Sequence, residues 1–412
     1  MKEWKTYKLE DLLSTPVRNG LTKPSSIRGK GVKMIGMGEL FANEIIRDIE
    51  MPRVPTTESE LKLSSIEKGD LLFARQSLTL EGAGKCSLVK EVTEPTVFES
   101  HIIRCRVNKS LVLPEYLYYY FRSRFGRYKI ECIVEQVAAA GIRGKDLIKI
   151  EIPVPDMQTQ RGIVDCLSIL DEKIHYNSLI NDNLEQQAQA LYKSWFVDFE
   201  PFKDGEFVES EMGEIPVGWT VVKFSDLTDI PKKTINPQRF PDTIFKHYSL
   251  PACDNGLIPE NQTGKDIMSN KIILQNNTTL FSKLNPRIKR IWFTCEVQPN
   301  SICSTEFIPY RATNENESGY IFSIINSEAF YASVMGCVNG ATGSHQRFHA
   351  EDTDDFLCAY NKEAANEFSQ HIDVILKQMH DLRQENVKLA STRDTLLPKL
   401  MSGELKINEI DC

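Results

Sequence analysis

The sequence predicts a mixed α/β (α+β) chain with two globular domains separated by a long antiparallel two-helix coiled coil. Three observations favour this fold class. The chain has 412 residues, which is long for a single hydrophobic core. Short sequence motifs occur twice, and two heptad-spaced stripes of mainly apolar residues are related by an offset of 205 residues. Together these features predict a pseudo-two-fold internal repeat of globular domain, helix, globular domain and helix.

The internal repeat is visible in short stretches. Residues 4–12, WKTYKLEDL, and residues 219–227, WTVVKFSDL, share the pattern W-x3-K-[LF]-x-D-L. Residues 71–75, LLFAR, are similar to residues 279–283, TLFSK. We therefore predict that the second half of the chain repeats the organisation of the first.

The stripes have the alternating steps of four and three that are typical of a coiled-coil seam rather than a general core face. The first comprises Ile163, Leu167, Leu170, Ile174, Asn177, Asn181, Leu184, Ala188, Leu191 and Trp195. The second comprises Phe368, Ile372, Ile375, Met379, Leu382, Asn386, Leu389, Arg393, Leu396 and Leu400. Each helix is expected to pair with the other copy.

The order of the segments favours an antiparallel pair. Each globular domain precedes its helix, and only the short polar linker 201–218 joins the first helix to the second domain. In a parallel pair the chain would have to return along the whole helix, about 48 Å, before the second domain began. We therefore expect the two domains at opposite ends of the helical pair.

Asparagines interrupt this apolar seam at Asn177, Asn181 and Asn386. Polar residues on a seam lower stability but disfavour registers in which they have no partner. Asn181 and Asn386 occupy equivalent places and are expected to meet or flank each other. Two interpretations remain open at this point: the asparagines specify the register, or they lie partly exposed where the seam is loose.

Local signals set the predicted boundaries. Pro153 and Pro155 precede Asp156, a suitable N-cap for the first helix, and Ser402-Gly403 is expected to end the second. Pro398 is expected to kink or fray the last turn. Residues 100–107, 271–277 and 319–325 are predicted strands, and residues 114–130 a predicted helix. The predicted segments are domain 1–155, helix 156–200, linker 201–218, domain 219–358, helix 359–405 and tail 406–412.

Charge and composition narrow the function class only in part. The formal net charge is −8, yet Lys and Arg outnumber Asp and Glu by 25 to 20 in residues 1–155. A local phosphate-facing surface and ordinary surface variation both explain this excess. No apolar run is long enough for a membrane span, and the start does not resemble a signal peptide. Ten cysteines without a C-x-x-C pair argue against a zinc ribbon and fit reduced thiols in a cytoplasm.

Catalytic motifs are missing from the sequence. It contains no G-x4-G-K-[ST], H-E-x-x-H, G-x-S-x-G or G-x-G-x-x-G, and no N-P-P-[YF] of amino-methyltransferases. The seven histidines lie apart from one another, and His175 and His371 are expected on helix surfaces. We therefore predict no catalytic residue, metal site or cofactor, and a chain that binds and positions.

Residues 170–202 and 210–219 resemble the central conserved region of the specificity subunit of type I restriction-modification systems. The specific signals are LY-x2-WF-x-DF at 191–199 and GEIP-x-GW at 213–219. Residues 138–155 and 339–356 are similar to the glycine-containing ends of target-recognition domains. The IPVP that ends the first domain is replaced by CAYN at 358–361 in the second, a departure from the pattern.

This resemblance implies a function and partners. Each globular domain would be a target-recognition domain that reads one half of a split, asymmetric sequence in double-stranded DNA. The coiled coil would fix the gap between the halves and dock two methyltransferase subunits, and through them motor-nuclease subunits. A protein-binding scaffold with paired recognition domains is the alternative, and a nuclease active only with divalent metal is a third hypothesis.

The candidate DNA-binding residues are Arg, Lys, Gln, His and Ser side chains in four loops, because these types pair with bases and phosphates. In the first domain they are Arg75, Gln76, Lys85, Arg143 and Lys145. In the second they are Lys283, Arg287, Lys289, Arg290, Ser344, His345, Gln346 and Arg347. Arg122, Arg124 and Arg127 are expected on a solvated helix face instead. The second domain's glycine loop could alternatively close that domain onto its helix.

Overall fold

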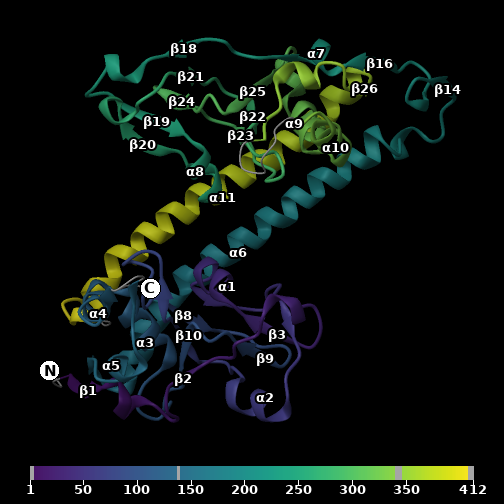
Figure 1. Cartoon of the computed structure of the whole chain (residues 1–412). Helices are drawn as coiled ribbons and strands as arrows, with labels where there is room; N and C mark the ends of the chain where they lie inside the picture. Colours follow the sequence, from purple (N-terminus) through teal and green to yellow (C-terminus); the bar gives the residue numbers. More distant parts are fainter. Residues whose placement is uncertain (1–3, 137–139, 339–345, 407–412) are drawn as a thin grey trace. The chain divides into compact units, whose positions relative to one another are not determined.

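The structure is a computed structural model that describes residues 4–136, 140–338 and 346–406. The chain divides into two compact units, each containing part of both long helices. We call residues 1–172 with 389–412 the first unit and residues 173–388 the second unit. Figure 1 labels their helices and strands.

The first unit is built on a five-stranded sheet of order β2-β10-β6-β8-β4, flanked by the sheets β5-β3-β9, β11-β12-β7 and β1-β13. Its strands are β1 (Lys5–Lys8), β2 (Arg18–Asn19), β3 (Val32–Ile35), β4 (Ile45–Ile46), β5 (Arg53–Val54), β6 (Leu71–Ala74), β7 (Gln76–Ser77), β8 (Cys86–Val89), β9 (Thr96–Phe98), β10 (Ile102–Cys105), β11 (Glu135–Gln136), β12 (Ala140–Gly141) and β13 (Glu151–Val154). Its short helices are α1 (Met37–Ala42), α2 (Glu58–Ser64), α3 (Pro114–Arg122), α4 (Arg124–Glu131) and α5 (Gly144–Leu147).

The second unit is built on a four-stranded sheet of order β17-β25-β22-β23 and a five-stranded sheet of order β18-β21-β24-β19-β20. Its strands are β14 (Phe207–Ser210), β15 (Gly213–Pro216), β16 (Thr220–Lys223), β17 (Thr228–Asp229), β18 (Thr234–Ile235), β19 (Ile244–Tyr248), β20 (Glu260–Thr263), β21 (Lys271–Ile273), β22 (Thr278–Ser282), β23 (Ile291–Thr294), β24 (Ser301–Cys303), β25 (Phe307–Ala312) and β26 (Leu357–Tyr360). Its short helices are α7 (Phe224–Leu227), α8 (Leu250–Asp254), α9 (Ser318–Asn326) and α10 (Glu328–Cys337).

The two units share a strand order. In the first, β2-β10-β6-β8 are neighbours, and in the second β17-β25-β22-β23 follow the same sequence of connections. Each unit also pairs its opening strand with its closing strand, β1 with β13 and β16 with β26, both antiparallel. The first unit contains two parallel strand pairs, β3 with β9 and β4 with β8, and the second unit contains the parallel pair β19 with β24.

Two long helices, α6 (Met157–Phe196) and α11 (Lys362–Ser402), lie within the segments 156–200 and 359–405 that the sequence predicts as helical. Asp156 caps α6 as expected, since its carboxylate accepts a hydrogen bond from the Thr159 N–H at 2.9 Å. Gly403 follows the end of α11 with a φ of 72°, the left-handed conformation typical of a helix C-terminus.

The prediction for Pro398 was wrong in part, because α11 continues through it to Ser402. Leu397, Leu400 and Met401 are buried in the core of the first unit. Their burial holds the last turn in helical form although the proline removes one backbone donor.

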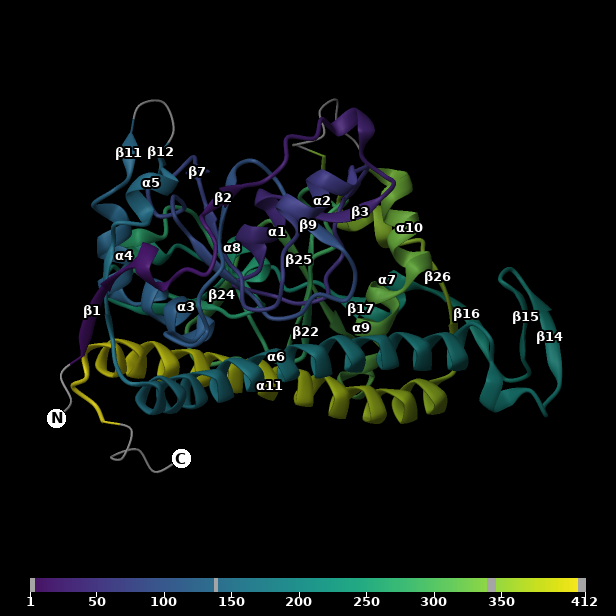
Figure 2. The ribbon, with the colours of Figure 1, turned by 90° about the horizontal axis from the view of Figure 1, so that it is seen from below.

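Two other local predictions need correction. Residues 319–325, predicted as a strand, lie in α9, where all nine residues are buried. A short apolar run has no polar face to reveal its period, so a buried helix and a buried strand look alike in sequence. Residues 201–218, predicted as a linker, contain the β14–β15 hairpin beside the C-terminal end of α6 (Figures 1 and 2).

Candidate nucleic-acid interface

In the second unit, two of the predicted clusters come together at one place. Residues 283–290 form the loop between β22 and β23, and Ser282 donates its N–H to the Arg290 carbonyl across its base. Leu284 forms a β-bridge with Arg347, and the Asn285 N–H donates to the Gln346 carbonyl at 2.9 Å. The β22–β23 loop is therefore attached to the end of the glycine-containing loop.

The four cations of the β22–β23 loop have different surroundings. Lys289 donates to the Asn326 carbonyl at 2.6 Å, and burial lowers the pKa of its ammonium group. Arg290 forms two hydrogen bonds with the Asp254 carboxylate, which raise the pKa of the guanidinium. Arg287 is exposed and Lys283 half-buried, and neither side chain pairs with another described residue. Arg287 is thus the cation of this loop best placed to meet a ligand.

The other arm of this interface contributes Gln346 and Arg347. Arg347 forms an ion pair with Glu306 at 3.0 Å. The Gln346 side-chain oxygen is buried and has no hydrogen-bond partner among the described residues. Ser344 and His345, also predicted to contact DNA, lie outside the described residues.

The first unit brings its two predicted clusters together in the same way. Residues 75–85 form the loop between β6 and β8, and β7 within that loop pairs with β12. Gln76 lies opposite Gly141, and the Ile142 N–H donates to the Arg75 carbonyl at 2.9 Å. A side chain at Gly141 would lie only 3.0 Å from that carbonyl, so glycine permits the close approach.

The polar side chains of the first interface also differ in their partners. Lys85 donates to the Phe41 carbonyl at 2.8 Å, and Arg143 is ion-paired with Glu135. Gln76 and Lys145 are exposed and Arg75 is half-buried, without a side-chain partner among the described residues. Gln76 therefore presents both its amide donors and its amide oxygen to solvent.

The prediction that Arg122 and Arg127 lie on a solvated face was wrong. Arg122 forms an ion pair with Glu44 at 2.7 Å. Arg127 on α4 donates to the Leu80 carbonyl at 3.0 Å and to the Ala83 carbonyl at 2.9 Å. Arg127 thereby anchors the β6–β8 loop to α4. Tyr331 on α10 does the same in the second unit, since its hydroxyl donates to the Pro286 carbonyl at 2.7 Å.

Sequence analysis based on polar residue types missed two side chains of these loops. Leu78 at the tip of the β6–β8 loop is 99% exposed, and Ile288 in the β22–β23 loop is 53% exposed. An aliphatic residue within a polar loop between two buried strands is the sequence signal that would have identified both.

The seam positions of α6 and α11 are all buried or half-buried. Within the second unit the two helices run in opposite directions along their contact. Asn177 lies opposite Asn386, and the Phe196 ring packs against Phe368 with centroids 5.0 Å apart.

The asparagine contacts differ from the sequence expectation. Asn386 meets Asn177 and not Asn181: the Asn177 amide donates to the Asn386 oxygen at 2.8 Å and to the Glu385 carboxylate at 2.7 Å. Asn177 is 0% exposed, so its position is not a loosened part of the seam. Asn181 is also buried, and its side-chain oxygen has no partner among the described residues. An equivalent position in the repeat does not make two residues opposite each other when the contact is antiparallel.

In the first unit a charged group takes the place of the amides. Arg393, the one basic residue on the predicted seam, donates to the Asp171 carboxylate at 2.7 Å, and Tyr119 on α3 donates to its other oxygen at 2.7 Å. Burial alone would lower the pKa of Arg393, but its hydrogen bonds to Asp394 and Asp171 raise it instead. This buried group joins α3, α6 and α11 within one unit.

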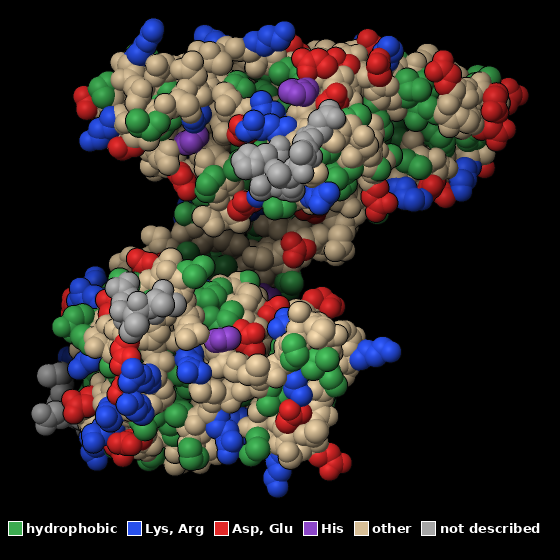
Figure 3. Space-filling view, in the orientation of Figure 1, with side chains coloured by type: hydrophobic (Ala, Val, Ile, Leu, Met, Phe, Trp, Pro, Cys, Tyr) green, Lys and Arg blue, Asp and Glu red, His purple; other side chains and the backbone are tan. Residues whose placement is uncertain are grey.

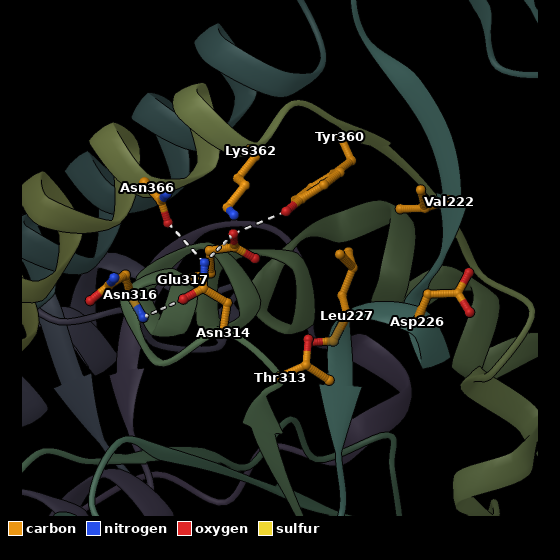
Figure 4. Close-up of a pocket in the computed structure, with 10 residues that line it drawn as sticks. All are labelled: Val222, Asp226, Leu227, Thr313, Asn314, Asn316, Glu317, Tyr360, Lys362 and Asn366. Atoms are coloured by element: carbon orange, nitrogen blue, oxygen red, sulfur yellow. Dashed lines mark hydrogen bonds between the residues drawn. The ribbon is translucent and has the colours of Figure 1, made fainter.

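A pocket of about 410 Å³ in the second unit contains polar side chains (Figure 4). Glu317 is buried there and accepts hydrogen bonds from the Asn314 amide at 2.7 Å and the Tyr360 hydroxyl at 3.0 Å. Burial and this bond raise the pKa of Tyr360 to about 12. Since these groups bond to one another and Asn314 also bonds to Asn366, the pocket anchors the start of α11 to α9.

Other site chemistry is lacking in the part of the chain that the structure describes. These residues contain no cluster of three or more His, Cys, Asp or Glu side chains placed to hold a metal ion. Among them no helix combines the length and apolar character of a membrane span. On the displayed faces, Lys and Arg side chains are interspersed with Asp and Glu (Figure 3).

Comparison with known proteins relates the chain to one family. Residues 1–186 match the family model described as the type I restriction modification DNA specificity domain. The MjaIX specificity subunit of Methanocaldococcus jannaschii is 24% identical over 99% of this chain and 95% of its own length. The match to the family model covers less than half of the chain, and over nearly its whole length the chain is similar to the specificity subunits of type I restriction-modification systems. This similarity supports a role in DNA recognition and not in catalysis.

Two further comparisons extend this similarity to specificity subunits. The HindI specificity subunit of Haemophilus influenzae is 30% identical over 49% of this chain and 43% of its own length. The crystal structure of a type I S subunit from M. genitalium aligns with 96% of this chain and 96% of its own, with a TM-score of 0.57 and 14% identity. That likeness shows a shared fold.

Proposed function

We propose that this chain is a specificity subunit and reads a bipartite, asymmetric target in double-stranded DNA, one half with domain 1–155 and the other with domain 219–358. The observation that carries the proposal is that each unit attaches a hairpin loop to its terminal loop in the same way, but with different side chains. Gln76 is exposed in one loop and Arg287 in the other. Because glutamine pairs with adenine and arginine with guanine, the two half-sites would differ.

We further propose that α6 and α11 form an antiparallel coiled coil that sets the spacer between the half-sites. Two observations support this: every predicted seam position is buried or half-buried, and the helices run in opposite directions in the second unit. The Asn177–Asn386 pair would specify the register, since a slip would leave the buried Asn177 amide without its partner. A slip of one heptad is about 10 Å along the axis. On B-DNA this equals about three base pairs.

The outer faces of these helices would dock two methyltransferase subunits, and through them motor-nuclease subunits. Apolar side chains that a pair of helices leaves uncovered support this role. Tyr176, Leu179 and Ile180 on α6 and Val374 on α11 are exposed. Exposed apolar surface on a helix that also has a buried seam is typical of a second protein contact.

The test is to sequence methylated bases in a host that carries the methyltransferase partner, with and without this chain. We expect one bipartite motif with two unlike halves and a fixed spacer that appears only with the chain. Binding of the chain–methyltransferase complex to random and selected duplexes should then differ. Binding that ignores sequence at every salt concentration would instead indicate the protein-binding scaffold.

A further inference from the structure

Leu78 is an unusual surface residue of the first unit. It is 99% exposed, more than Leu80 at 47% in the same loop. Single exposed apolar residues are common on protein surfaces and need no explanation by themselves. Leu78, however, lies two residues after Gln76, in the loop that β7 and β12 attach to the end of the domain.

The second unit exposes an aliphatic side chain at the corresponding place. Ile288 lies in the β22–β23 loop, next to Arg287, and is 53% exposed. Its N–H donates to the Asn285 carbonyl at 2.9 Å, which closes a tight turn that brings Arg287 and Ile288 to the surface. Two loops of different length and sequence therefore each combine an exposed polar reader with an exposed aliphatic neighbour.

Hydrogen bonds to neighbouring parts of the protein hold both loops in place. In the first unit Ser77 accepts a hydrogen bond from the Thr79 N–H at 3.1 Å, and Arg127 bonds the Leu80 and Ala83 carbonyls. In the second unit Tyr331 bonds the Pro286 carbonyl. Because these loops are already fixed, their exposed side chains lose little further conformational entropy on binding. They are therefore well suited to contact a ligand.

The chemistry of a base pair suggests what these side chains meet. In the major groove an A·T pair presents the adenine N7 and N6 groups beside the C5-methyl of thymine. That methyl group is the apolar feature of the groove edge, and aliphatic side chains recognise it. A polar reader with an aliphatic neighbour therefore matches a step that contains a thymine.

We propose that Leu78 and Ile288 are specificity-determining residues, each contacting the C5-methyl group of a thymine in the major groove of its own half-site. This inference rests on the proposed function, because it requires that the two loops face DNA. Gln76 and Arg287 then contact bases next to those thymines, and the aliphatic side chains exclude water from the polar contacts.

The test removes the C5-methyl group of thymine from the DNA and, separately, the aliphatic side chain from the protein. The complex of the full chain with its methyltransferase partner first selects duplexes from a randomised pool. Each thymine of the selected site is then replaced by uracil, which lacks only the C5-methyl. For the wild-type chain we expect one position in each half-site where uracil weakens binding about fourfold, the factor that corresponds to burying one methyl group.

The variants assign those positions to residues. Leu78→Ala should weaken binding of the thymine duplex about fourfold and abolish the thymine–uracil difference in the first half-site only. Ile288→Ala should do the same in the second half-site only. Leu80→Ala and Ile244→Ala remove exposed aliphatic side chains of the same units, at 47% and 60% exposure, and should leave both differences unchanged.

The outcomes separate the two levels of the proposal. If the pool yields no bipartite motif, the proposed function fails and this inference with it. If a bipartite motif emerges but no thymine responds to uracil, or Leu78→Ala and Ile288→Ala leave the response intact, only this inference is overturned. Equal weakening of thymine and uracil duplexes by the variants would also overturn it, because the side chains would then act on loop structure.

Discussion

The two units share the order of their main strands but differ in the loops that those strands carry. Both order their main strands alike and attach a hairpin loop to a terminal loop. In the first, the exposed polar side chain is the neutral Gln76, while Lys85 is bonded to the Phe41 carbonyl. In the second it is the cationic Arg287, while Lys289 and Arg290 bond to neighbouring groups. The comparison shows that the exposed side chains of the loops can vary while the arrangement of strands that carries the loops is kept.

The helices show a second difference between the units. The buried polar group in the first unit is ionic, Asp171 with Arg393 and Tyr119, whereas the second unit uses the neutral Asn177–Asn386 pair. A buried charge without its partner costs much more free energy than an unpaired amide. The first unit should therefore be the more sensitive to loss of one seam partner.

The largest effect is expected for Asp171→Ala. This substitution leaves Arg393 buried without its partner and removes the acceptor of the Tyr119 hydroxyl. We expect the first unit to lose about 3–5 kcal/mol of unfolding free energy. Hydrogen exchange of first-unit amides measures this, and the double variant Asp171→Leu with Arg393→Met should recover most of the loss. A loss below ~1 kcal/mol would show that the pair is not a structural contact.

A smaller, more selective effect is expected from the loops. Gln76→Ala should relax base choice in the first half-site and Arg287→Ala in the second, each by about 1–3 kcal/mol, because one base contact is lost. Lys145→Ala is the matched control, since loss of a phosphate contact weakens binding to all sequences alike. Selection from randomised duplexes measures all three. If either loop variant changed base choice in both half-sites, the two domains would not read DNA independently of each other.

The smallest expected effect is on the pH dependence of stability, because the two units differ in their buried carboxylates. Both oxygens of Asp171 are hydrogen-bonded, whereas one oxygen of Asp373 on α11 has no partner among the described residues. Burial raises the pKa of Asp373 to about 6. The folded second unit thus favours the protonated acid, and this stabilisation is present below about pH 4 and lost as pH rises through about 6.

The corresponding measurement compares wild type with Asp373→Asn. Between pH 4.5 and 7 we expect the free energy of unfolding of the second unit to fall by about 1–2 kcal/mol more in the wild type than in the variant. The expected difference is small because the Asp373 side chain is half-exposed. Hydrogen exchange of second-unit amides at the two pH values gives this difference. Equal pH dependence of both proteins would show that Asp373 is not buried as an acid.

The long helices were the most predictable part of the fold. Heptad spacing, Asp156 and Gly403 are local signals, and α6 and α11 follow them closely. Residues 319–325 were not predictable as a helix, because a wholly buried run lacks the polar positions that reveal its period. The opposition of Asn177 and Asn386 depends on the packed register of two helices, which one helix alone does not specify.

The candidate interface was predictable by residue type but not by partner. Lys289 and Arg290 look the same as Arg287 in sequence, and only the fold shows that the first two bond to Asn326 and Asp254. The joining of residues 283–290 with residues 346–347 is a long-range contact and leaves no local signal. The exposure of Leu78 was not predictable from its residue type, because an aliphatic side chain by itself gives no local signal that it points into solvent.

The most direct test of the central claim is to shorten both helices by one heptad. Deleting residues 175–181 and 383–389 removes the Asn177–Asn386 pair from both sides and preserves the heptad repeat. Sequencing of methylated bases in cells with this variant and its methyltransferase partner should show both half-sites unchanged and a spacer shortened by about three base pairs. An unchanged spacer, or altered half-sites, would contradict the claim that the helices measure the distance between two independent readers.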